Sequence, residues 1–168
     1  SDRYTVSKLA ARVLQQEIER YRESHQDPVL KIASRYFHDL TQGSFAGLRT
    51  DVNDNAEPIL VGVRPDNLRL TVDKMSAGTR DQLFLALRLA TLEWGLEKSG
   101  DMAQKPESMP FIVDDILINF DDDRARATLA VLAQLSRKTQ VILFTHHRQI
   151  VEEANRMKER EDIHVHEL

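Results

Sequence analysis

The chain has 168 residues, and its 23 Lys and Arg against 27 Asp and Glu give a formal net charge of −4 at pH 7. This length fits one domain or one lobe of a larger assembly, and the negative charge excludes a protein that holds nucleic acid by an overall positive field. With 41% hydrophobic and 30% charged residues, the composition is typical of a soluble globular protein. No apolar run approaches the roughly 18 residues of a membrane span.

Cysteine is absent from the chain. This absence excludes a disulfide scaffold, a zinc site built on thiolates and thiol catalysis, and it favours a reducing compartment. We therefore expect a cytoplasmic protein with no membrane partner. The first residues, Ser1-Asp2-Arg3, include neither an initiator methionine nor a signal-peptide pattern, which favours a piece excised from a longer protein.

Glycine is scarce, with six residues where an average usage of ~7% predicts about twelve. Only Gly95 and Gly100 have the G-x-x-x-x-G spacing of a phosphate-binding loop, and Asp101-Met102 follows where Lys-Ser/Thr is required. The chain therefore has no phosphate-binding loop of its own.

The first half of the chain predicts two helices and a β-meander. Residues 4–25 have a polar pattern with a thin apolar stripe, which suggests a coiled coil without establishing it. Asp27 and Pro28 are a good cap and first residue for an amphipathic helix that we expect to end at Gly43. Apolar and polar residues then alternate in three stretches between 45 and 73, separated by turn residues, which predicts an antiparallel meander.

The second half predicts alternating helices and strands. Two short, wholly apolar strands separated by a helix indicate a parallel pair joined by a right-handed crossover. The helix before them is apolar nearly all round, so we expect it to be buried on several sides. The expected elements are a helix over 79–98, a loop over 99–109, a strand over 111–113, a helix over 124–135, a strand over 141–144, a helix carrying Ile150, Val151, Ala154 and Met157, and a last strand over 162–166.

Acidic and imidazole side chains follow the two predicted parallel strands. Asp114 and Asp115 come after the first strand, and His146 and His147 follow the second. Ligands bind at the carboxyl ends of such strands, and paired acids there are typical of nucleotide hydrolases, where one acid holds Mg²⁺ and the next orients the attacking water. The alternative is that the two aspartates only cap a turn.

A second candidate site lies over residues 75–82, where the small residues Ser76, Ala77 and Gly78 lead into the long apolar helix. The free N–H groups, the hydroxyl and the positive dipole end of such a helix start suit a phosphate. Thr79 and Gln82 also have the spacing of a capping box. For this segment alone, an ordinary helix cap is the favoured interpretation.

Three motifs that follow one another along the chain identify a protein family far more specifically than any one of them does alone. Residues 75–90, 110–121 and 140–147 together resemble the C-terminal lobe of ABC-class ATPases, and within that class the coiled-coil branch of SMC-type and YhaN-like ATPases. The resemblance covers about residues 30–168. It implies an α/β fold that is the C-terminal half of a P-loop ABC-type ATPase head, with a mostly parallel sheet, flanking helices and a small antiparallel meander.

The resemblance also implies how the chain is divided. Residues 1–26 are expected to be the helix next to the coiled coil, and residues 27–168 the C-terminal lobe of the head. In this family an N-terminal lobe of the same protein carries the Walker A phosphate-binding loop, at the other end of the coiled coil. That arrangement accounts for the missing loop.

Residues 75–79 resemble the signature motif of this family. By that resemblance, Ser76 and Gly78 correspond to residues that face the γ-phosphate of an ATP held by a partner head. Ala77 and Thr79 belong to the same nucleotide-binding motif. These two residues depart from the commonest ABC signature, which has Gly and Gln there, although a YhaN-like branch tolerates both changes.

The other two motifs supply the remaining site residues by resemblance. Asp114 resembles the Walker B residue that binds Mg²⁺ through water, and Asp115 stands at the place of the usual catalytic glutamate, with a side chain one methylene shorter. Asn119 and Asp121 resemble the D-loop that crosses the dimer interface. His146 resembles the switch histidine that contacts the γ-phosphate.

The resemblance implies a head that dimerises around ATP and Mg²⁺, hydrolyses the ATP and moves a coiled coil on DNA, in DNA repair or chromosome organisation. The implied partners are the Walker A lobe, a second head in a homodimer, DNA and a nuclease. One alternative is a nucleotide-gated scaffold with little turnover. Another is a small metal-dependent phosphohydrolase that is complete in this chain.

Three further features have a structural alternative that we favour. His147, His164 and His166 suit a metal site, but a solvated edge strand is the favoured interpretation. Two basic clusters, over 137–138 and 156–160, suit DNA phosphates, but neighbouring acids favour a solvated surface. Arg88, inside the apolar helix, is expected to pair with a carboxylate.

Overall fold

A computed structural model describes residues 8–9, 12–13, 27–99, 110–114 and 121–168. The predicted coiled-coil-proximal helix over 4–25 and the loop over 99–109 lie almost wholly outside this part of the chain. In the described part, no helix combines the length and the apolar character needed to cross a membrane.

The first described element is α2, which spans Pro28–Leu40 as the sequence predicts. The carboxylate of Asp27 caps it by accepting a hydrogen bond from the backbone N–H of Val29 at 2.9 Å. Beyond the helix the chain turns through Gln42 and Gly43, whose φ values are 54° and 77°. Gly43 therefore lies where the backbone needs the left-handed region that glycine adopts without strain.

The predicted meander is present as three antiparallel strands, β1 (Gly47–Val52), β2 (Pro58–Val63) and β3 (Arg69–Thr71), in the order β1-β2-β3. The short 3₁₀ helix η1 (Val72–Lys74) follows. Gly62 allows Met75 to approach β2 closely, because a Cβ at this position would lie 2.8 Å from the Met75 methyl carbon.

The second half alternates helices and strands as predicted. Strands β4 and β5 pair in parallel, with Asp114 opposite Phe144. This pair is the whole parallel sheet among the described residues, beside the three-stranded meander. The elements are α3 (Ala77–Ser99), β4 (Phe111–Asp114), α4 (Asp122–Leu135), β5 (Val141–Phe144) and α5 (Arg148–Met157).

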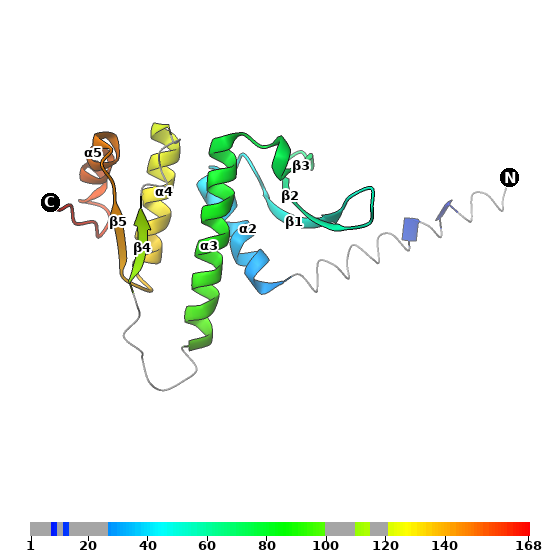
Figure 1. The fold of residues 1–168 in the computed structure, drawn as a ribbon, viewed down its shortest axis with the longest axis horizontal. Helices are drawn as coiled ribbons and strands as arrows, with labels where there is room; N and C mark the ends of the chain where they lie inside the picture. The colour runs from blue at the N-terminus through cyan, green and yellow to red at the C-terminus, as the bar shows by residue number, and fades with distance from the viewer. Residues whose placement is uncertain (1–7, 10–11, 14–26, 100–109, 115–120) are drawn as a thin grey trace.

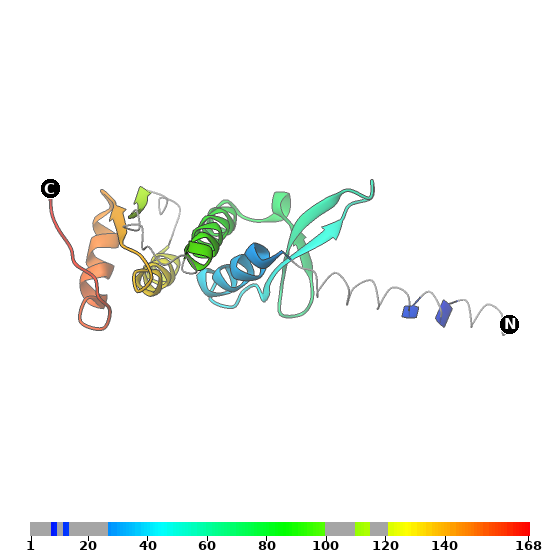
Figure 2. The same cartoon turned by 90° about the horizontal axis from the view of Figure 1, so that it is seen from below.

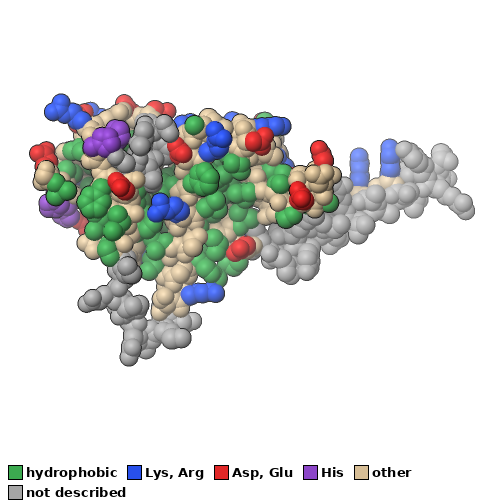
Figure 3. Space-filling model, in the orientation of Figure 1, with side chains coloured by type: hydrophobic (Ala, Val, Ile, Leu, Met, Phe, Trp, Pro, Cys, Tyr) green, Lys and Arg blue, Asp and Glu red, His purple; other side chains and the backbone are tan. Residues whose placement is uncertain are grey.

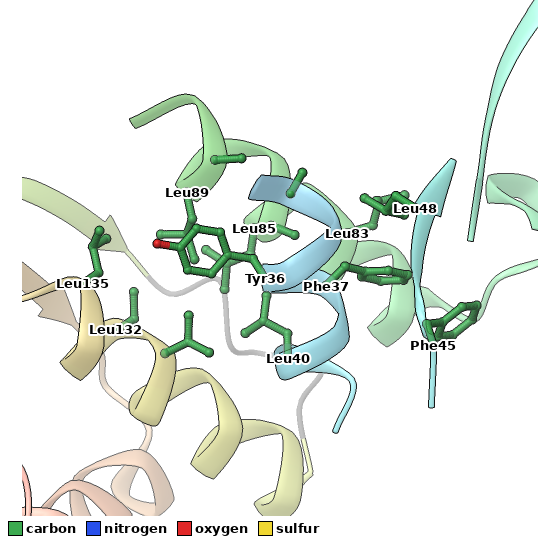
Figure 4. Packing of buried hydrophobic residues seen from close by; sticks show 14 of the residues in the cluster. Tyr36, Phe37, Leu40, Phe45, Leu48, Leu83, Leu85, Leu89, Leu132 and Leu135 are labelled. Carbon is green, nitrogen blue, oxygen red and sulfur yellow. The ribbon is translucent and has the colours of Figure 1, made fainter. Parts of the chain in front are cut away.

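The main core lies where α2, α3 and α4 meet. Figures 1 and 2 show the elements in a row, from the meander through α2, α3 and α4 to β4, β5 and α5. In Figure 4, Tyr36 and Leu40 of α2 lie between the leucines of α3 and those of α4, while Phe37 contacts Phe45, with ring centroids 4.9 Å apart. A smaller cluster joins α4 to α5 through Ala125, Leu129, Ile150 and Ala154.

One predicted element is wrong. No strand forms over residues 162–166. Ile163 and Val165, whose alternation predicts the strand, do turn to one side and pack against the α4–α5 cluster. A strand also needs a neighbour for its backbone hydrogen bonds, and the described residues place no strand beside this segment.

Candidate functional site

The predicted site residues that the structure describes lie along one edge of the molecule. Figure 1 shows the N-termini of α3 and α4 and the carboxyl ends of β4 and β5 at the same upper edge. This edge therefore carries Ser76 before α3, Asp114 at the end of β4, Asp121 before α4 and His146 after β5. Asp115 and Asn119, the other two predicted site residues, lie outside the described residues.

Ser76 caps α3. Its Oγ accepts a hydrogen bond from the backbone N–H of Thr79 at 3.2 Å and lies 2.8 Å from the Thr79 hydroxyl oxygen. The predicted capping-box pair of Thr79 with Gln82 is wrong. Gln82 is buried and donates from Nε2 to the carbonyl oxygen of Leu40 at 2.6 Å, because its side chain points into the α2–α3 contact and away from the helix start.

The first turn of α3 has an outer and an inner side. Ser76 and Ala77 are exposed, whereas Gly78 and Thr79 are buried in this chain. The start of the helix thus offers a hydroxyl and the positive end of the helix dipole to the outside. This arrangement fits the negative charge of a phosphate.

The paired ends of β4 and β5 bring an acid and a histidine to the same edge. Asp114 is exposed and lies opposite Phe144, the last residue of β5, and His146 follows two residues beyond the end of that strand. An exposed carboxylate at a strand end is the hard oxygen donor that Mg²⁺ prefers, directly or through water, so the donor present fits the predicted ion.

The segment after β5 makes a short turn that positions the two histidines. The backbone N–H of His147 donates to the hydroxyl of Thr145 at 3.1 Å, and the rings of His146 and His147 lie 4.3 Å apart between centroids, tilted by 33°. His146 is exposed and His147 half-buried. The imidazole of His146 is therefore accessible beside the strand that ends in Asp114.

Asp121 caps α4. Its Oδ1 accepts a hydrogen bond from the backbone N–H of Arg124 at 2.9 Å, and its side chain is exposed. Gln42 donates from Nε2 to the carbonyl oxygen of Asp123 at 2.9 Å, which connects the end of α2 to the same helix start. This bond holds the start of α4 against the turn that follows α2.

A buried acid outside the predicted site connects α2 and α3 to the segment after α4, toward the end of α3 away from this edge. Glu93 of α3 is 1% exposed and accepts hydrogen bonds from Arg35 at 2.7 Å and from Lys138 at 2.5 Å. Burial alone would raise the pKa of Glu93, but the hydrogen bonds from Lys138, Tyr36 and Arg35 more than offset it and lower the pKa to about 2. The position of Glu93 between Leu92 and Trp94, in the largely apolar part of this helix, was the signal.

The favoured structural interpretations of the basic clusters fit the contacts. Lys138 pairs with Glu93, Arg156 with Glu153 at 3.2 Å, and Arg137 lies 3.9 Å from Glu161. These acids offset the positive charge that a DNA phosphate would need.

The three histidines considered for a metal site do not form one in the described part of the chain, where no three metal-ligating side chains gather. His164 instead lies 3.2 Å from Asp162. Among the described residues, Arg88 contacts an aromatic side chain and pairs with no carboxylate: its guanidinium lies over the ring of Phe111, 5.7 Å from the centroid.

No family model matches this chain. Protein YhaN of Bacillus subtilis is 25% identical over 143 residues, which are 84% of this chain and 14% of YhaN. The chain therefore spans a small part of the curated relative that it matches.

The solved structures that are most similar include SMC head domains. The head domain of Thermotoga maritima SMC gives a TM-score of 0.53 at 23% identity, over 83% of this chain and 44% of that chain. A structure from work on ATP-driven dimerization and DNA-stimulated activation of SMC ATPases gives 0.57 at 16% identity, over 82% and 76%. The Pyrococcus furiosus Smc head bound to the C-terminal domain of ScpA gives 0.54 at 16% identity, over 75% and 30%. The chain thus has the α/β fold of the C-terminal part of an SMC ATPase head.

Proposed function

We propose that this chain is the C-terminal half of an SMC- or YhaN-like head that binds and hydrolyses ATP between two heads. The observation that carries the proposal is the shared edge, where the exposed start of α3 and the acid–histidine end of the β4–β5 pair lie together. One part of this edge suits a phosphate and the other a magnesium ion and an attacking water.

The signature part of the edge acts on the ATP of the partner head. The N–H groups at the start of α3 and the hydroxyl of Ser76 bind the γ-phosphate, with Ala77, Gly78 and Thr79 shaping that helix start. Because Ser76 already accepts the N–H of Thr79, its hydroxyl is held in position before the phosphate arrives. A positioned dipole needs little reorganisation on binding.

The acidic part of the edge acts on the ATP of its own head. Asp114 holds Mg²⁺ through water, and the ion neutralises charge on the phosphates when it is bound. Asp115 orients the attacking water as a general base, and His146 contacts the γ-phosphate from the neighbouring strand. Asn119 and Asp121 belong to the segment that reaches the second head.

The rest of the nucleotide site comes from parts of the assembly outside residues 1–168. The sequence has no phosphate-binding loop, so a Walker A lobe of the same protein supplies the grip on the β- and γ-phosphates, and a second head completes the homodimer. One SMC neighbour, whose solved structure comes from work on ATP-driven dimerization, supports this assembly.

Head closure would move a coiled coil that continues from residues 1–26. We infer a role in DNA repair or chromosome organisation in the cytoplasm, with DNA as a partner and a nuclease as a further candidate partner. The likeness to SMC heads, one of them described with DNA-stimulated activation, supports this role.

Calorimetric titration with Mg-ATP tests the half-site. Residues 1–168 alone lack the loop and lysine that grip the phosphates, and one helix start contributes only about 1 kcal/mol, so no tight binding is expected. The full-length protein is expected to bind and hydrolyse ATP. Micromolar binding by residues 1–168 would favour a hydrolase complete in this chain, and a full-length protein that binds without turnover would favour the nucleotide-gated scaffold.

A further inference from the structure

A second buried carboxylate joins α4 to α5. The side chain of Glu153 in α5 is 7% exposed, and its Oε1 accepts a hydrogen bond from Nε of Arg126 in α4 at 2.6 Å. Arg156, three residues further along α5, donates to the other carboxylate oxygen at 3.2 Å. The hydrogen bond from Arg126 and the charges of both arginines lower the pKa of Glu153, so this carboxylate is ionised at neutral pH.

The ion pair between Arg126 and Glu153 lies close to the start of each helix that it joins. Asp121 is the cap of α4, five residues before Arg126, and His147 is the cap of α5, six residues before Glu153. At about 1.5 Å of rise per residue, both ends lie within about 9 Å of their caps along the helix axes. Figure 3 shows charged and histidine side chains along the upper edge, where the candidate site lies. The pair therefore lies within two helical turns of that edge.

The two helices do not need an ion pair to stay together. Apolar residues already pack between them, namely Ala125, Leu129, Ile150 and Ala154. Burying a carboxylate costs desolvation energy that an apolar pair of similar size would avoid. Apolar contacts are also non-directional, whereas a hydrogen bond fixes a distance and an angle between its partners. The ion pair thus defines how α5 is aligned along α4.

This alignment sets the relation between two residues of the candidate site. Asp121 caps α4 by accepting a backbone N–H of its first turn, and the proposed function places it in the segment that reaches the second head. His146 directly precedes His147, whose carbonyl oxygen accepts the N–H groups of Ile150 and Val151 in α5. A shift of α5 along α4 would therefore move His146 relative to Asp121.

We propose that Arg126 and Glu153 are positioning residues for hydrolysis, because their ion pair fixes His146 relative to Asp121 when two heads meet around ATP. The inference rests on the proposed function. Neither residue contacts the nucleotide, and both act through the helices that they join. Turnover depends on the pair, whereas the affinity of each head for ATP does not, since the grip on the phosphates comes from the Walker A lobe.

Two arginines on one carboxylate give a matched pair of variants. Arg126→Gln removes the bond between the helices, whereas Arg156→Gln removes a bond within α5 and leaves α4 joined to Glu153. The side chains of the two arginines are 51% and 69% exposed, so neither substitution leaves a cavity in the core and both variants should fold. Urea unfolding of each variant checks this.

Single-turnover hydrolysis and ATP affinity are measured in the full-length protein. Arg126→Gln is expected to slow turnover on the order of tenfold with unchanged affinity, because a small misplacement of a group at the reacting atoms lowers the rate strongly. Arg156→Gln should leave both quantities unchanged. Arg126→Lys keeps a cation within reach of the carboxylate and should restore most of the rate.

A double-mutant cycle tests whether the pair acts through His146. If it does, Arg126→Gln added to His146→Ala should slow turnover by less than about twofold further. Equal factors with and without His146 would show that the pair does not position this histidine. A loss of ATP affinity in proportion to the loss of turnover would show that Arg126 only supports the fold.

The failure of this inference differs from the failure of the proposed function. Unchanged turnover in Arg126→Gln, beside an active unaltered protein, would refute the positioning role alone. An unaltered full-length protein that binds ATP without turnover would refute the proposed function, and the positioning role would fall with it.

Discussion

Glu93 in α3 and Lys138, just beyond α4, form an ion pair with 2.5 Å between Oε1 and Nζ, although 45 residues separate them in sequence. Arg35 of α2 binds the other carboxylate oxygen at 2.7 Å. The helix that starts at Ser76 is thereby tied to the segment that leads into β5 and His146. This charge cluster lies toward the end of α3 away from Ser76 and links α2 and α3 to the chain between α4 and β5.

Removing the charge of Glu93 should weaken the fold. Glu93→Gln is expected to lower the free energy of unfolding by about 1–3 kcal/mol, because the buried side chain loses its negative charge and one of its two acceptor oxygens becomes an NH2 donor that faces Arg35 or Lys138. The loss stays below the 3–5 kcal/mol of a fully buried broken pair, since Arg35 and Lys138 are half exposed and can turn to water. Urea unfolding measures it. The control is Glu97→Gln, whose exposed carboxylate lies 3.9 Å from Lys138, with an expected change under about 0.5 kcal/mol.

Lowering the pH should destabilise the fold through Glu93. The pKa of Glu93 lies at about 2 in the folded chain, below the usual range of a glutamate, because the hydrogen bonds from Lys138, Tyr36 and Arg35 outweigh its burial. The ionised form therefore stabilises the fold above the unfolded pKa, and this contribution is lost as the pH falls toward 2. Unfolding measured between pH 5 and pH 2 should show a steeper loss for the unaltered protein than for Glu93→Gln. Parallel curves would assign the acid sensitivity to other carboxylates.

Periodicity and capping were enough to predict most of the fold. The α2 cap at Asp27, the three meander strands and the parallel β4–β5 pair each follow from local spacing, which the packed structure does not override. The strand over 162–166 fails for a non-local reason. Ile163 and Val165 show which side is apolar, but a strand depends on a neighbour that no local pattern reveals.

For the candidate site, the sequence predicted which element ends carry the residues but not the directions of the side chains. Motif order placed Asp114 and His146 at the carboxyl ends of neighbouring strands and Ser76 at a helix start, and the structure has them at these element ends. Which acceptor takes the helix N–H groups depends on side-chain directions, so Gln82 was misassigned as a cap. Glu93 was missed because its partners come from α2 and from beyond α4, distant in sequence.

The cap and phosphate roles of Ser76 can be separated by substitution. Ser76→Ala should cost about 1 kcal/mol of stability, since the N–H of Thr79 loses its acceptor. Ser76→Asp keeps a good cap, so stability should be nearly unchanged, but its negative charge repels the γ-phosphate of a partner head. Ser76→Arg fills the same space with a bulky cation. In the full-length protein, both Asp and Arg variants should keep ATP binding by each head and lose ATP-dependent dimerisation.

Sedimentation with a non-hydrolysable ATP analogue measures the dimer fraction of the Ser76 variants. Thermal unfolding of the same variants measures how much stability the helix cap contributes. If Ser76→Asp dimerises like the unaltered protein, Ser76 is only a cap and does not belong to the nucleotide site.

Changing Asp114 or Asp115 to asparagine should affect nucleotide binding and turnover differently. Asp114 ends β4 as an exposed carboxylate, and losing its charge removes support for Mg²⁺, so nucleotide affinity should become weak and insensitive to magnesium. Asp115→Asn removes the group that orients water and eases repulsion with the γ-phosphate. Binding should survive, turnover should fall on the order of 10²-fold or more, and ATP-bound dimers should accumulate.

Single-turnover hydrolysis and nucleotide affinity, measured side by side in the full-length protein, decide between these roles. His146→Ala should slow turnover as well, because it removes a γ-phosphate contact from the strand that pairs with β4. His164→Ala is the matched histidine control, since that ring pairs with Asp162 near the chain end, and its turnover should be unchanged. If Asp114→Asn and Asp115→Asn lose affinity equally and neither accumulates a dimer, the two acids share one structural role at the end of β4, because a water-orienting group and a magnesium-supporting group cannot fail identically.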